Sequence, residues 1–250
     1  MKQKIIFTAD ILKEWDCPRR GYLAQKDRWA GEHKMRKPLP QAWEGIDDYI
    51  HKRIFNFLRP IEDKWSRREV FKPYIISLPE ELREEADAIF QNFVNFFQKD
   101  MLFQLYPCDS DRFMRGQIGK YYVEGTADLI GGAKGFCLVR DWRTDCDIPP
   151  EEKIEDLELP LYAILYDDLF HDKYFTDFAL QYIFLRQNYI KSLAMSREGL
   201  RKWKEKIIER MDFISKSIDS SAEPAPMPSP DKCSCCDYSA SCPTGQRGGK

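Results

Sequence analysis

The sequence predicts an α/β domain in which helices precede a β-hairpin and a cysteine cluster lies near the end of the chain. Apolar residues at helical spacing come first, over residues 43–58 and 79–105. Residues 121–130 and 136–144 are short, rich in β-forming residues and separated by a glycine-rich stretch, which predicts the hairpin. This order fits a single α/β domain with a helical elaboration inserted before the hairpin.

The composition is that of an ordinary globular protein. Of 250 residues, 43% are hydrophobic, which is enough for a substantial core. Lys and Arg total 39 against 41 for Asp and Glu, so the net charge of -2 gives no overall attraction to nucleic acid. A nucleic-acid site must therefore be a local basic groove. No apolar run suits a membrane span or a signal peptide, so we expect a cytoplasmic protein with no membrane contact.

The chain is expected to begin with a short helix. Residues 8–15 carry apolar side chains at helical spacing, and Thr8 or Asp10 is the expected N-cap. This helix would present Cys17 at its end.

Two longer helices are expected next. The helix over residues 43–58 is amphipathic, carries His51 and is expected to end at Pro60. The helix over residues 79–105 has one wide apolar face.

Regular elements continue after the hairpin. We predict a helix over residues 157–169, a strand over 176–185 and a basic amphipathic helix over 201–218. Residues 223–230 form an extended proline-rich connector.

Acidic residues lie on both strands of the predicted hairpin. Gly125-Thr126-Ala127-Asp128 is on the first strand and Asp141-Trp142-Arg143 on the second. Alternate side chains of a strand share a face, so Asp141 and Arg143 should project to one side and Trp142 to the other. If Asp128 lies alongside Asp141, the two carboxylates and the Trp142 backbone carbonyl can bind Mg²⁺ or Mn²⁺. The simpler alternative is a solvated aspartate and a local ion pair.

Four cysteines have a pattern typical of metal ligands. Cys233-x2-Cys236 is a tight chelate, Cys242 adds a third thiolate, and Cys17 would supply the fourth by chain closure. Four thiolates suit a 4Fe-4S cluster or a tetrahedral Zn²⁺, and the spacing alone favours zinc. Cys235 is a neighbouring thiol that can compete as a ligand.

The cysteine pattern also predicts how the chain closes. We expect one domain over residues 1–250, with residues 223–243 packed back onto the region of Cys17 as a structural staple. Cys108, Cys137 and Cys146 lack chelate spacing and are interpreted as buried or incidental thiols, with Cys137 on the strand face of Asp141.

Taken together, these motifs resemble the PD-(D/E)XK nuclease superfamily. The run from Gly125 to Asp128, then Asp141-x-Arg143-Thr144, then Glu158-x-x-x-Tyr162 looks like its core. The opening Cys17-Pro18-Arg19-Arg20 with the terminal Cys233-x2-Cys236-x5-Cys242-Pro243 is similar to its RecB-like iron-sulfur branch. That branch includes CRISPR-adaptation exonucleases and AddB-type recombination nucleases. The resemblance spans residues 8–243, although residues 60–110 carry no motif.

The resemblance implies a restriction-endonuclease-like core, a mixed β-sheet flanked by helices, and hydrolysis of DNA phosphodiester bonds with Mg²⁺ or Mn²⁺. Asp128, Asp141 and the Trp142 carbonyl would bind the metal, and His51 matches the histidine that this branch adds as a further ligand. Tyr162, one helical turn after Glu158, matches a tyrosine associated with positioning the DNA or the catalytic groups.

The resemblance also shifts the expected cysteine-bound cofactor from zinc to a 4Fe-4S cluster. Its ligands would be Cys17, Cys233, Cys236 and Cys242. The implied substrate is DNA with single-stranded ends or overhangs, and an integrase or a helicase is a candidate protein partner.

Two residues depart from the family pattern. The family lysine is Arg143 here, and a guanidinium can stabilise charge on phosphate but cannot act as a general base. The family glutamine is Glu158 here, which can become a metal ligand or repel phosphate. These departures favour a second hypothesis, a DNA-end-binding or scaffolding protein that has lost efficient cleavage. A third is a zinc-stapled interaction domain with no DNA role.

Ordinary structural roles also explain three of these side chains. His51 lies near an apolar helix face, where a core histidine is common. Tyr162 and Glu158 lie in an apolar helix, where a core tyrosine and an exposed glutamate are almost equally expected.

Basic residues interleaved with aromatic ones follow Cys17 and are the better candidates for nucleic-acid contact. They are Arg19, Arg20, Lys26 and Arg28, with Tyr22 and Trp29 among them. The aromatic residues can also pack around the metal site. A second basic stretch, Lys202, Lys204, Lys206 and Arg210, is explained equally well by a solvated helix face.

Overall fold

The computed structural model describes residues 5–30, 41–66, 77–101, 108–133, 135–144, 157–169, 175–220, 223–227, 233, 236, 238 and 242, with backbone alone for residues 41–44 and 60–66. The chain forms two compact units. The first comprises Met1–Pro38, Gln117–Val123 and Glu205–Lys250, and the second comprises Leu39–Gly116 and Glu124–Lys204. The expected single domain over residues 1–250, with residues 223–243 closing onto the Cys17 region, stays a prediction.

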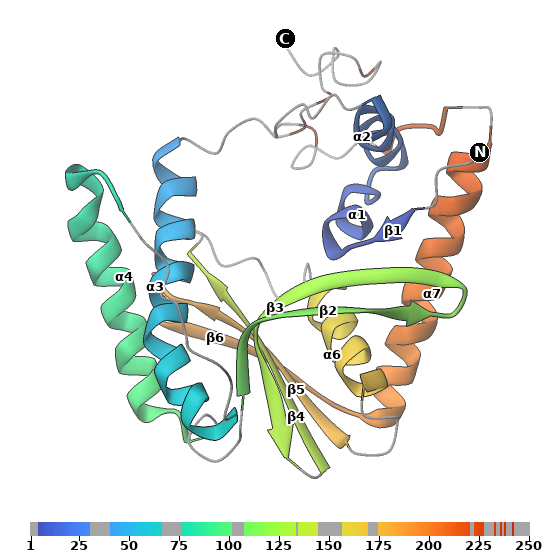
Figure 1. Cartoon of the computed structure of the whole chain (residues 1–250). Helices are drawn as coiled ribbons and strands as arrows, with labels where there is room; N and C mark the ends of the chain where they lie inside the picture. Colours follow the sequence, from blue (N-terminus) through green and yellow to red (C-terminus); the bar gives the residue numbers. More distant parts are fainter. Residues whose placement is uncertain are drawn as a thin grey trace. The chain divides into compact units, whose positions relative to one another are not determined.

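The described helices and strands come in groups along the chain (Figure 1). They are β1 (Ile6–Phe7), α1 (Ala9–Glu14), α2 (Pro18–Ala30), α3 (Gln41–Ser66), α4 (Glu80–Lys99), β2 (Cys108–Ile118), β3 (Tyr121–Ala133), β4 (Gly135–Arg143), α6 (Glu158–Leu169), β5 (Phe175–Phe184), β6 (Tyr189–Ser196) and α7 (Arg197–Asp219). No helix among the described residues is both long and apolar enough to cross a membrane.

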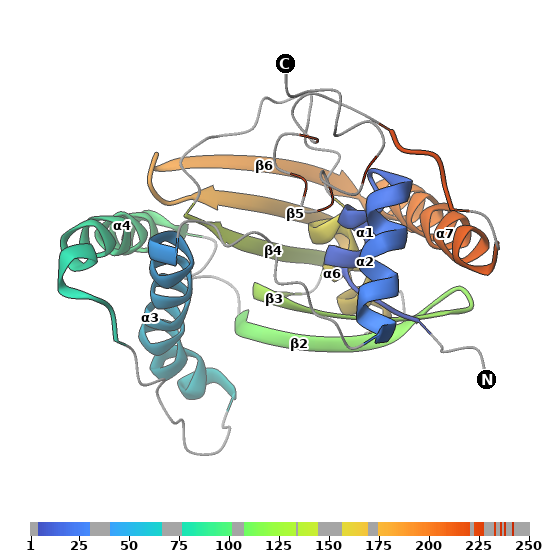
Figure 2. The ribbon, with the colours of Figure 1, turned by 90° about the horizontal axis from the view of Figure 1, so that it is seen from above.

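The strands form a mixed sheet. Their order is β1-β3-β4-β5-β6, with β2 also paired to β3, and Figure 2 shows the run from β2 to β6 from above. The β3–β4 and β5–β6 pairs are antiparallel, whereas β4 and β5 are parallel. Parallel neighbours need a crossover connection, and α6 lies in that connection and contacts both strands. A mixed sheet with flanking helices confirms the predicted α/β class.

In the second unit, α3 and α4 lie side by side and share an apolar core with the sheet (Figures 1 and 2). Ile50 of α3 and Phe93 of α4 are fully buried there, together with Trp142 of β4. The Phe93 ring meets the Trp142 ring edge-on, with 5.3 Å between ring centroids. Burying each such side chain contributes about 1.5–3 kcal/mol. This packing fixes α3 against β4, beside the acidic residues of the hairpin.

The first unit is organised around Trp15, whose side chain is fully buried after α1. Its ring meets that of Phe213 in α7 edge-on, at 6.2 Å between centroids. Arg210 of α7 donates to the Asp16 carboxylate at 2.7 Å. Apolar packing and an ion pair therefore hold the chain around Cys17 onto the C-terminal part of α7.

The local chemistry of the helix ends explains two outcomes. Thr8, not Asp10, caps α1, because its hydroxyl accepts from the Ile11 amide at 3.3 Å. The prediction that the second helix ends at Pro60 was wrong, because α3 continues to Ser66. A proline removes one backbone hydrogen bond, and here that loss does not end the helix.

The other predicted elements are confirmed with shifted ends. Helix α4 ends at Lys99 and α7 begins at Arg197, while α6 and β5 lie within a residue of their predicted bounds. The hairpin ladder extends to the pair Ala133 and Phe136, which shortens the expected turn. Residues 102–107, with the predicted end of α4, lie outside the described residues.

Strands β1, β2 and β6 were missed. The sequence of β2, CDSDRFMRGQI, is mostly polar, and β6 has mostly exposed residues without a clean alternation. Pairing with β3 and β5 imposes the extended form on these segments, which propensity alone does not predict. Strand β1 has only two residues.

Candidate active site

The hairpin places the two acidic motifs side by side. Leu129 pairs with Arg140, and continuing this register by one residue puts Asp128 opposite Asp141. The Asp128 Oδ2 atom accepts the backbone N–H of Trp142 at 2.8 Å, which fixes that carboxylate against β4. As strand alternation predicts, Asp141 forms an ion pair with Arg143 while the Trp142 side chain packs on the other face.

His51 approaches the same point from α3. Its Nε2 atom lies 3.1 Å from the Trp142 carbonyl oxygen, and its Nδ1 atom lies 3.5 Å from Asp128 Oδ1. Adjacent ligands of an octahedral ion with bonds of about 2.1 Å are about 3.0 Å apart. The separation of Nε2 and the carbonyl oxygen therefore fits two adjacent ligands of one small cation.

Burial and neighbouring charges shift the pKa values of the two aspartates in opposite directions. Burial and the neighbouring Asp128 charge raise the pKa of Asp141 well above its usual range, while Arg143 acts in the opposite direction. Burial also opposes ionisation of Asp128, but charged His51 and the Trp142 N–H outweigh it and lower the Asp128 pKa. Two adjacent carboxylates of this kind are stabilised by a bound cation.

His51 responds to the same charges. Burial alone would lower its pKa, but the carboxylate of Asp128, followed by those of Asp47 and Asp141, outweighs burial and raises the pKa to about 10. An imidazolium ion therefore occupies part of the space where a metal cation would be bound. Metal binding at this nitrogen would displace that proton.

Arg143 links the acidic pair to α6. Its Nη2 atom donates to Glu158 Oε2 at 2.8 Å, and its guanidinium carbon lies 4.9 Å from the centre of the Tyr182 ring. Tyr162 donates its hydroxyl to Glu158 Oε1 at 3.0 Å. Burial and the Glu158 charge raise the Tyr162 pKa far above its usual range, so the phenol stays protonated and remains a donor.

The second unit thus brings together the site residues that the sequence suggested outside the cysteines. They are His51, Asp128, Asp141, Trp142 through its carbonyl, Arg143 and Glu158, with Tyr162 hydrogen-bonded to the last. Their chemistry, hard oxygens with one imidazole, suits a divalent cation such as Mg²⁺ or Mn²⁺. Within the described part of the chain, however, no three His, Cys, Asp or Glu side chains already form a closed metal-binding group.

Asp47 is a site residue that sequence reasoning missed. It lies one helical turn before His51, and its Oδ1 atom is 3.6 Å from His51 Nε2. It also accepts the hydroxyl of Thr144, the residue that follows β4. In the sequence, the only indication is an acidic residue four positions before a candidate histidine. That spacing places Asp47 in the site only once α3 is known to pack beside β4.

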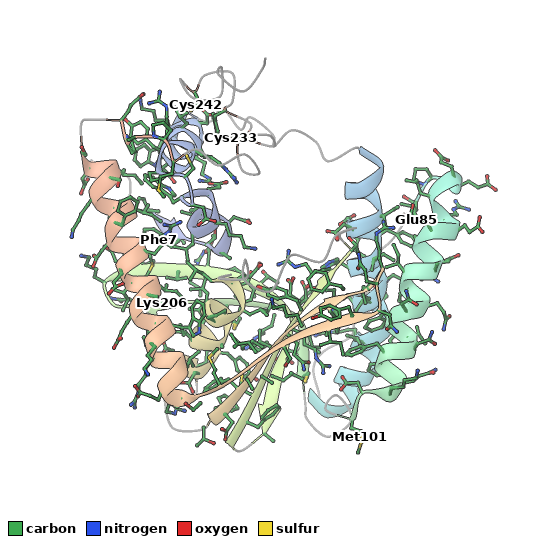
Figure 3. All side chains as sticks on the ribbon, turned by 180° about the vertical axis from the view of Figure 1, so that it is seen from behind. Phe7, Glu85, Met101, Lys206, Cys233 and Cys242 are labelled. Atoms are coloured by element: carbon green, nitrogen blue, oxygen red, sulfur yellow. The ribbon has the colours of Figure 1, made fainter. Side chains whose placement is uncertain are left out.

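The predicted cluster of four cysteine ligands is not shown. Cys17, Cys233, Cys236 and Cys242 are half-buried, and the described side chains do not form a metal-binding group of three or more ligands. Cys233 and Cys242 lie near one another beside α2, the helix that follows Cys17 (Figure 3). The Tyr238 hydroxyl donates to Asp27 of α2 at 2.9 Å, so part of the C-terminal segment contacts this helix.

The remaining cysteines are not part of the predicted four-cysteine group. Cys137 is fully buried on the Asp141 face of β4, and Cys108 is half-buried. Cys146 and Cys235 lie outside the described residues.

Several basic residues that were candidates for nucleic-acid contact are paired with acidic side chains. Arg28 donates to both oxygens of Glu14, at 2.7 and 2.6 Å. In the second basic stretch, Lys204 pairs with Asp168 at 3.1 Å and Arg210 with Asp16. These ion pairs favour the structural explanation for the second stretch.

Comparison with known proteins adds a family match. A model of the PD-(D/E)XK nuclease superfamily matches residues 22–243. A crystal structure from Eubacterium rectale, of a protein provisionally named an exonuclease, is similar with a TM-score of 0.57 and 11% identity, over 93% of this chain and 87% of that one. This similarity supports the fold.

A second crystal structure, of SSO0001, matches over 80% of this chain and 85% of that one, with 15% identity and a TM-score of 0.33, which is too low to bear on the fold. No curated protein matches the sequence.

Proposed function

Because this chain belongs to the PD-(D/E)XK nuclease superfamily, we propose that it is a metal-dependent deoxyribonuclease acting at single-stranded ends or overhangs. The family match supports nuclease activity on nucleic acid, and such nucleases generally use divalent metals such as Mg²⁺ or Mn²⁺. One observation carries the proposal to these residues: the Trp142 carbonyl, His51 and Asp128 converge beside Asp141.

In this proposal Asp128, Asp141, His51 and the Trp142 carbonyl hold the cation. A bound Mg²⁺ or Mn²⁺ would polarise the scissile phosphate and lower the pKa of an attacking water. The Trp142 N–H fixes Asp128. The Asp47 carboxylate is held by Thr144 and lies 3.6 Å from His51 Nε2, so it adds negative charge beside the cation site.

Arg143 would stabilise negative charge on the phosphate. Its guanidinium is held by Asp141 and Glu158 and lies over the Tyr182 ring, so its position is fixed before substrate arrives. It stays protonated and cannot take a proton from water, so the proton must leave to solvent or to another base. In this role Tyr162 holds Glu158, which keeps Arg143 in place.

A second candidate function is DNA-end binding or scaffolding without efficient cleavage. The observation that favours it is the pairing of Arg143 with two carboxylates, which neutralises much of the charge it can offer to phosphate. Arg143→Lys tests the choice by cleavage of labelled DNA with Mn²⁺. Activity that appears only in the lysine variant identifies a decayed nuclease, whereas activity that falls below the wild type shows that arginine is the adapted group.

The substrate class is tested with matched oligonucleotides of one sequence. Cleavage rates on single-stranded DNA, DNA with overhangs, blunt duplex DNA and RNA are compared for the wild type with Mn²⁺. The proposal predicts that the first two DNA substrates are cut fastest. RNA cut as fast as DNA would contradict the deoxyribonuclease assignment.

We further propose that Cys17, Cys233, Cys236 and Cys242 bind a 4Fe-4S cluster, as in the RecB-like iron-sulfur branch. The support is the contact of Tyr238 with α2 and the turn in which the Cys236 N–H donates to the Cys233 carbonyl at 3.4 Å. Zinc is the alternative occupant. The branch itself, and with it an integrase or helicase partner and a cytoplasmic location, stay predictions.

Iron, sulfide and zinc analysis of anaerobically purified protein tests the cluster. The proposal predicts brown protein with about four iron atoms per chain, lost in Cys17→Ser. Cys108→Ser, a half-buried cysteine outside the motif, is the matched control and should keep its iron. Colourless protein that contains zinc would contradict the iron-sulfur assignment.

A further inference from the structure

Helix α2 carries alternating cations and aromatic rings on one side. Arg19, Tyr22, Lys26 and Trp29 follow one another at intervals of three, four and three residues, which places them along one face of a helix. We call these residues the α2 stripe. The buried residues of α2 lie at other positions, Pro18, Gly21, Ala24 and Gln25. The stripe therefore runs along the border between the packed side of the helix and the exposed side.

The second half of the stripe is exposed, whereas the Arg19 side chain is only 18% exposed. The Lys26 side chain is 51% exposed and Trp29 is 41% exposed. The Lys26 ammonium lies 4.7 Å from the centre of the Tyr22 ring. A tryptophan that only filled the core around the cysteines would be buried, as Trp15 is. Exposed rings between cations are the surface on which single-stranded nucleic acids stack their bases.

A carboxylate already occupies the cations of the stripe. Glu223 Oε2 lies 2.9 Å from Arg19 Nη2, and its Oε1 lies 3.6 Å from Lys26 Nζ. Each oxygen faces one cation, as two oxygens of a phosphodiester would. The Arg19 Nε donor is buried and has no hydrogen-bond partner among the described residues. The site thus holds one carboxylate between two cations.

We infer that Arg19 and Lys26 form a backbone-phosphate site for single-stranded DNA, that Tyr22 and Trp29 stack the adjacent bases, and that Glu223 occupies this site until DNA displaces it. The inference rests on the proposed function, because it names the surface that holds the substrate strand. It gives the proline-rich segment after α7 an autoinhibitory contact as well as a connecting role.

The competition favours the nucleic acid. An exposed ion pair contributes less than about a tenfold factor to an equilibrium. Stacking of a base on an aromatic side chain contributes about 5- to 150-fold per base. A strand that replaces Glu223 regains both cation contacts and adds two stacked bases. Displacement of a partly exposed glutamate is therefore a small barrier to binding.

The test is the affinity for a fluorescent single-stranded oligothymidine, measured by anisotropy with cluster-loaded protein and no added divalent metal, so that binding is observed without cleavage. Glu223→Gln should tighten binding about 3- to 10-fold, because the net charge at Arg19, Lys26 and position 223 rises from one to two. Lys26→Ala should weaken binding by a similar factor and reduce the slope of log Kd against log salt by about 0.7.

The matched control is Lys202→Ala, which removes an exposed lysine from α7 and should change neither quantity. Tyr22→Leu should weaken binding without changing the salt slope, because stacking releases no counterion. The inference is overturned if Glu223→Gln fails to tighten binding while keeping its iron content, or if Lys26→Ala behaves like Lys202→Ala.

Failure of this inference can be told from failure of the proposed function. Cleavage with Mn²⁺ is scored separately on the same proteins. Intact cleavage with unchanged binding in Glu223→Gln and Lys26→Ala contradicts the stripe alone. Binding that depends on the stripe, without metal-dependent cleavage, contradicts the nuclease proposal alone.

Discussion

Gly125→Ala is a sharp test of how α6 supports the site. Gly125 opens the motif on β3 that ends at Asp128, and it lies under the ring of Tyr162. A Cβ atom at this position would be 2.4 Å from Tyr162 Cε1, 3.2 Å from Cδ1 and 3.4 Å from Cζ. Since ordinary contacts begin at 3.4 Å, the ring must move by about 1 Å.

This movement breaks a specific hydrogen bond. The Tyr162 hydroxyl is now 3.0 Å from Glu158 Oε1, and a shift of about 1 Å takes it beyond the hydrogen-bond range. Glu158 would then hold Arg143 less firmly. We expect a loss of about 1–3 kcal/mol in the free energy of unfolding, from overpacking. We also expect kcat/KM for DNA cleavage to fall up to about 100-fold, because misplacement by about 1 Å suffices for that loss.

A double-mutant cycle with Tyr162→Ala isolates the contact. Urea unfolding gives the free energies, and cleavage of labelled DNA with Mn²⁺ gives kcat/KM. In the Tyr162→Ala background the extra methyl group meets no ring, so Gly125→Ala should be neutral or stabilising by up to about 1 kcal/mol. An equal cost of Gly125→Ala in both backgrounds would refute the reasoning, because the cost would then come from the backbone and not from the ring.

Three further predictions concern stability, pH and the histidine. Asp100→Ala should lower the free energy of unfolding, measured by urea denaturation, by about 3–5 kcal/mol, because it leaves the buried guanidinium of Arg140 without its carboxylate partner. A loss below about 1 kcal/mol would contradict this reasoning. Since the pKa of His51 is about 10 without metal, Mn²⁺ must displace its proton. Calorimetry should therefore show proton release, and the Mn²⁺ affinity should fall up to about tenfold per pH unit as pH drops from about 9 to about 7. Binding that does not depend on pH would exclude His51 as a ligand. Asp47→Asn should lower the His51 pKa measured by NMR, because it removes a negative charge 3.6 Å from Nε2; an unchanged His51 titration would contradict this.

The parts of the fold that the sequence predicted are those with a strong local pattern. The hairpin of β3 and β4 has β-forming residues on both sides of a glycine-rich turn, and α6 has a continuous apolar run. Strand alternation correctly placed Asp141 and Arg143 on the face opposite the Trp142 side chain. Such inferences need only backbone geometry, so they survive without knowledge of the tertiary contacts.

The parts that were missed depend on partners distant in sequence. Strand β2 becomes a strand because β3 pairs with it. Asp47 joins the site only because α3 docks beside β4, which brings it to Thr144. In the same way, the basic residue Arg28 could not be known to pair with Glu14 until α1 and α2 were placed.

The measurement that tests the central claim most directly is cleavage of end-labelled single-stranded and duplex DNA by anaerobically purified protein with Mg²⁺ or Mn²⁺. Asp141→Ala is the matched control, because it removes one carboxylate of the pair that Asp128 and His51 complete. The account predicts metal-dependent cutting by the wild type and none by Asp141→Ala. Cutting that persists in Asp141→Ala, or no cutting by wild-type protein with a full metal complement, would contradict it.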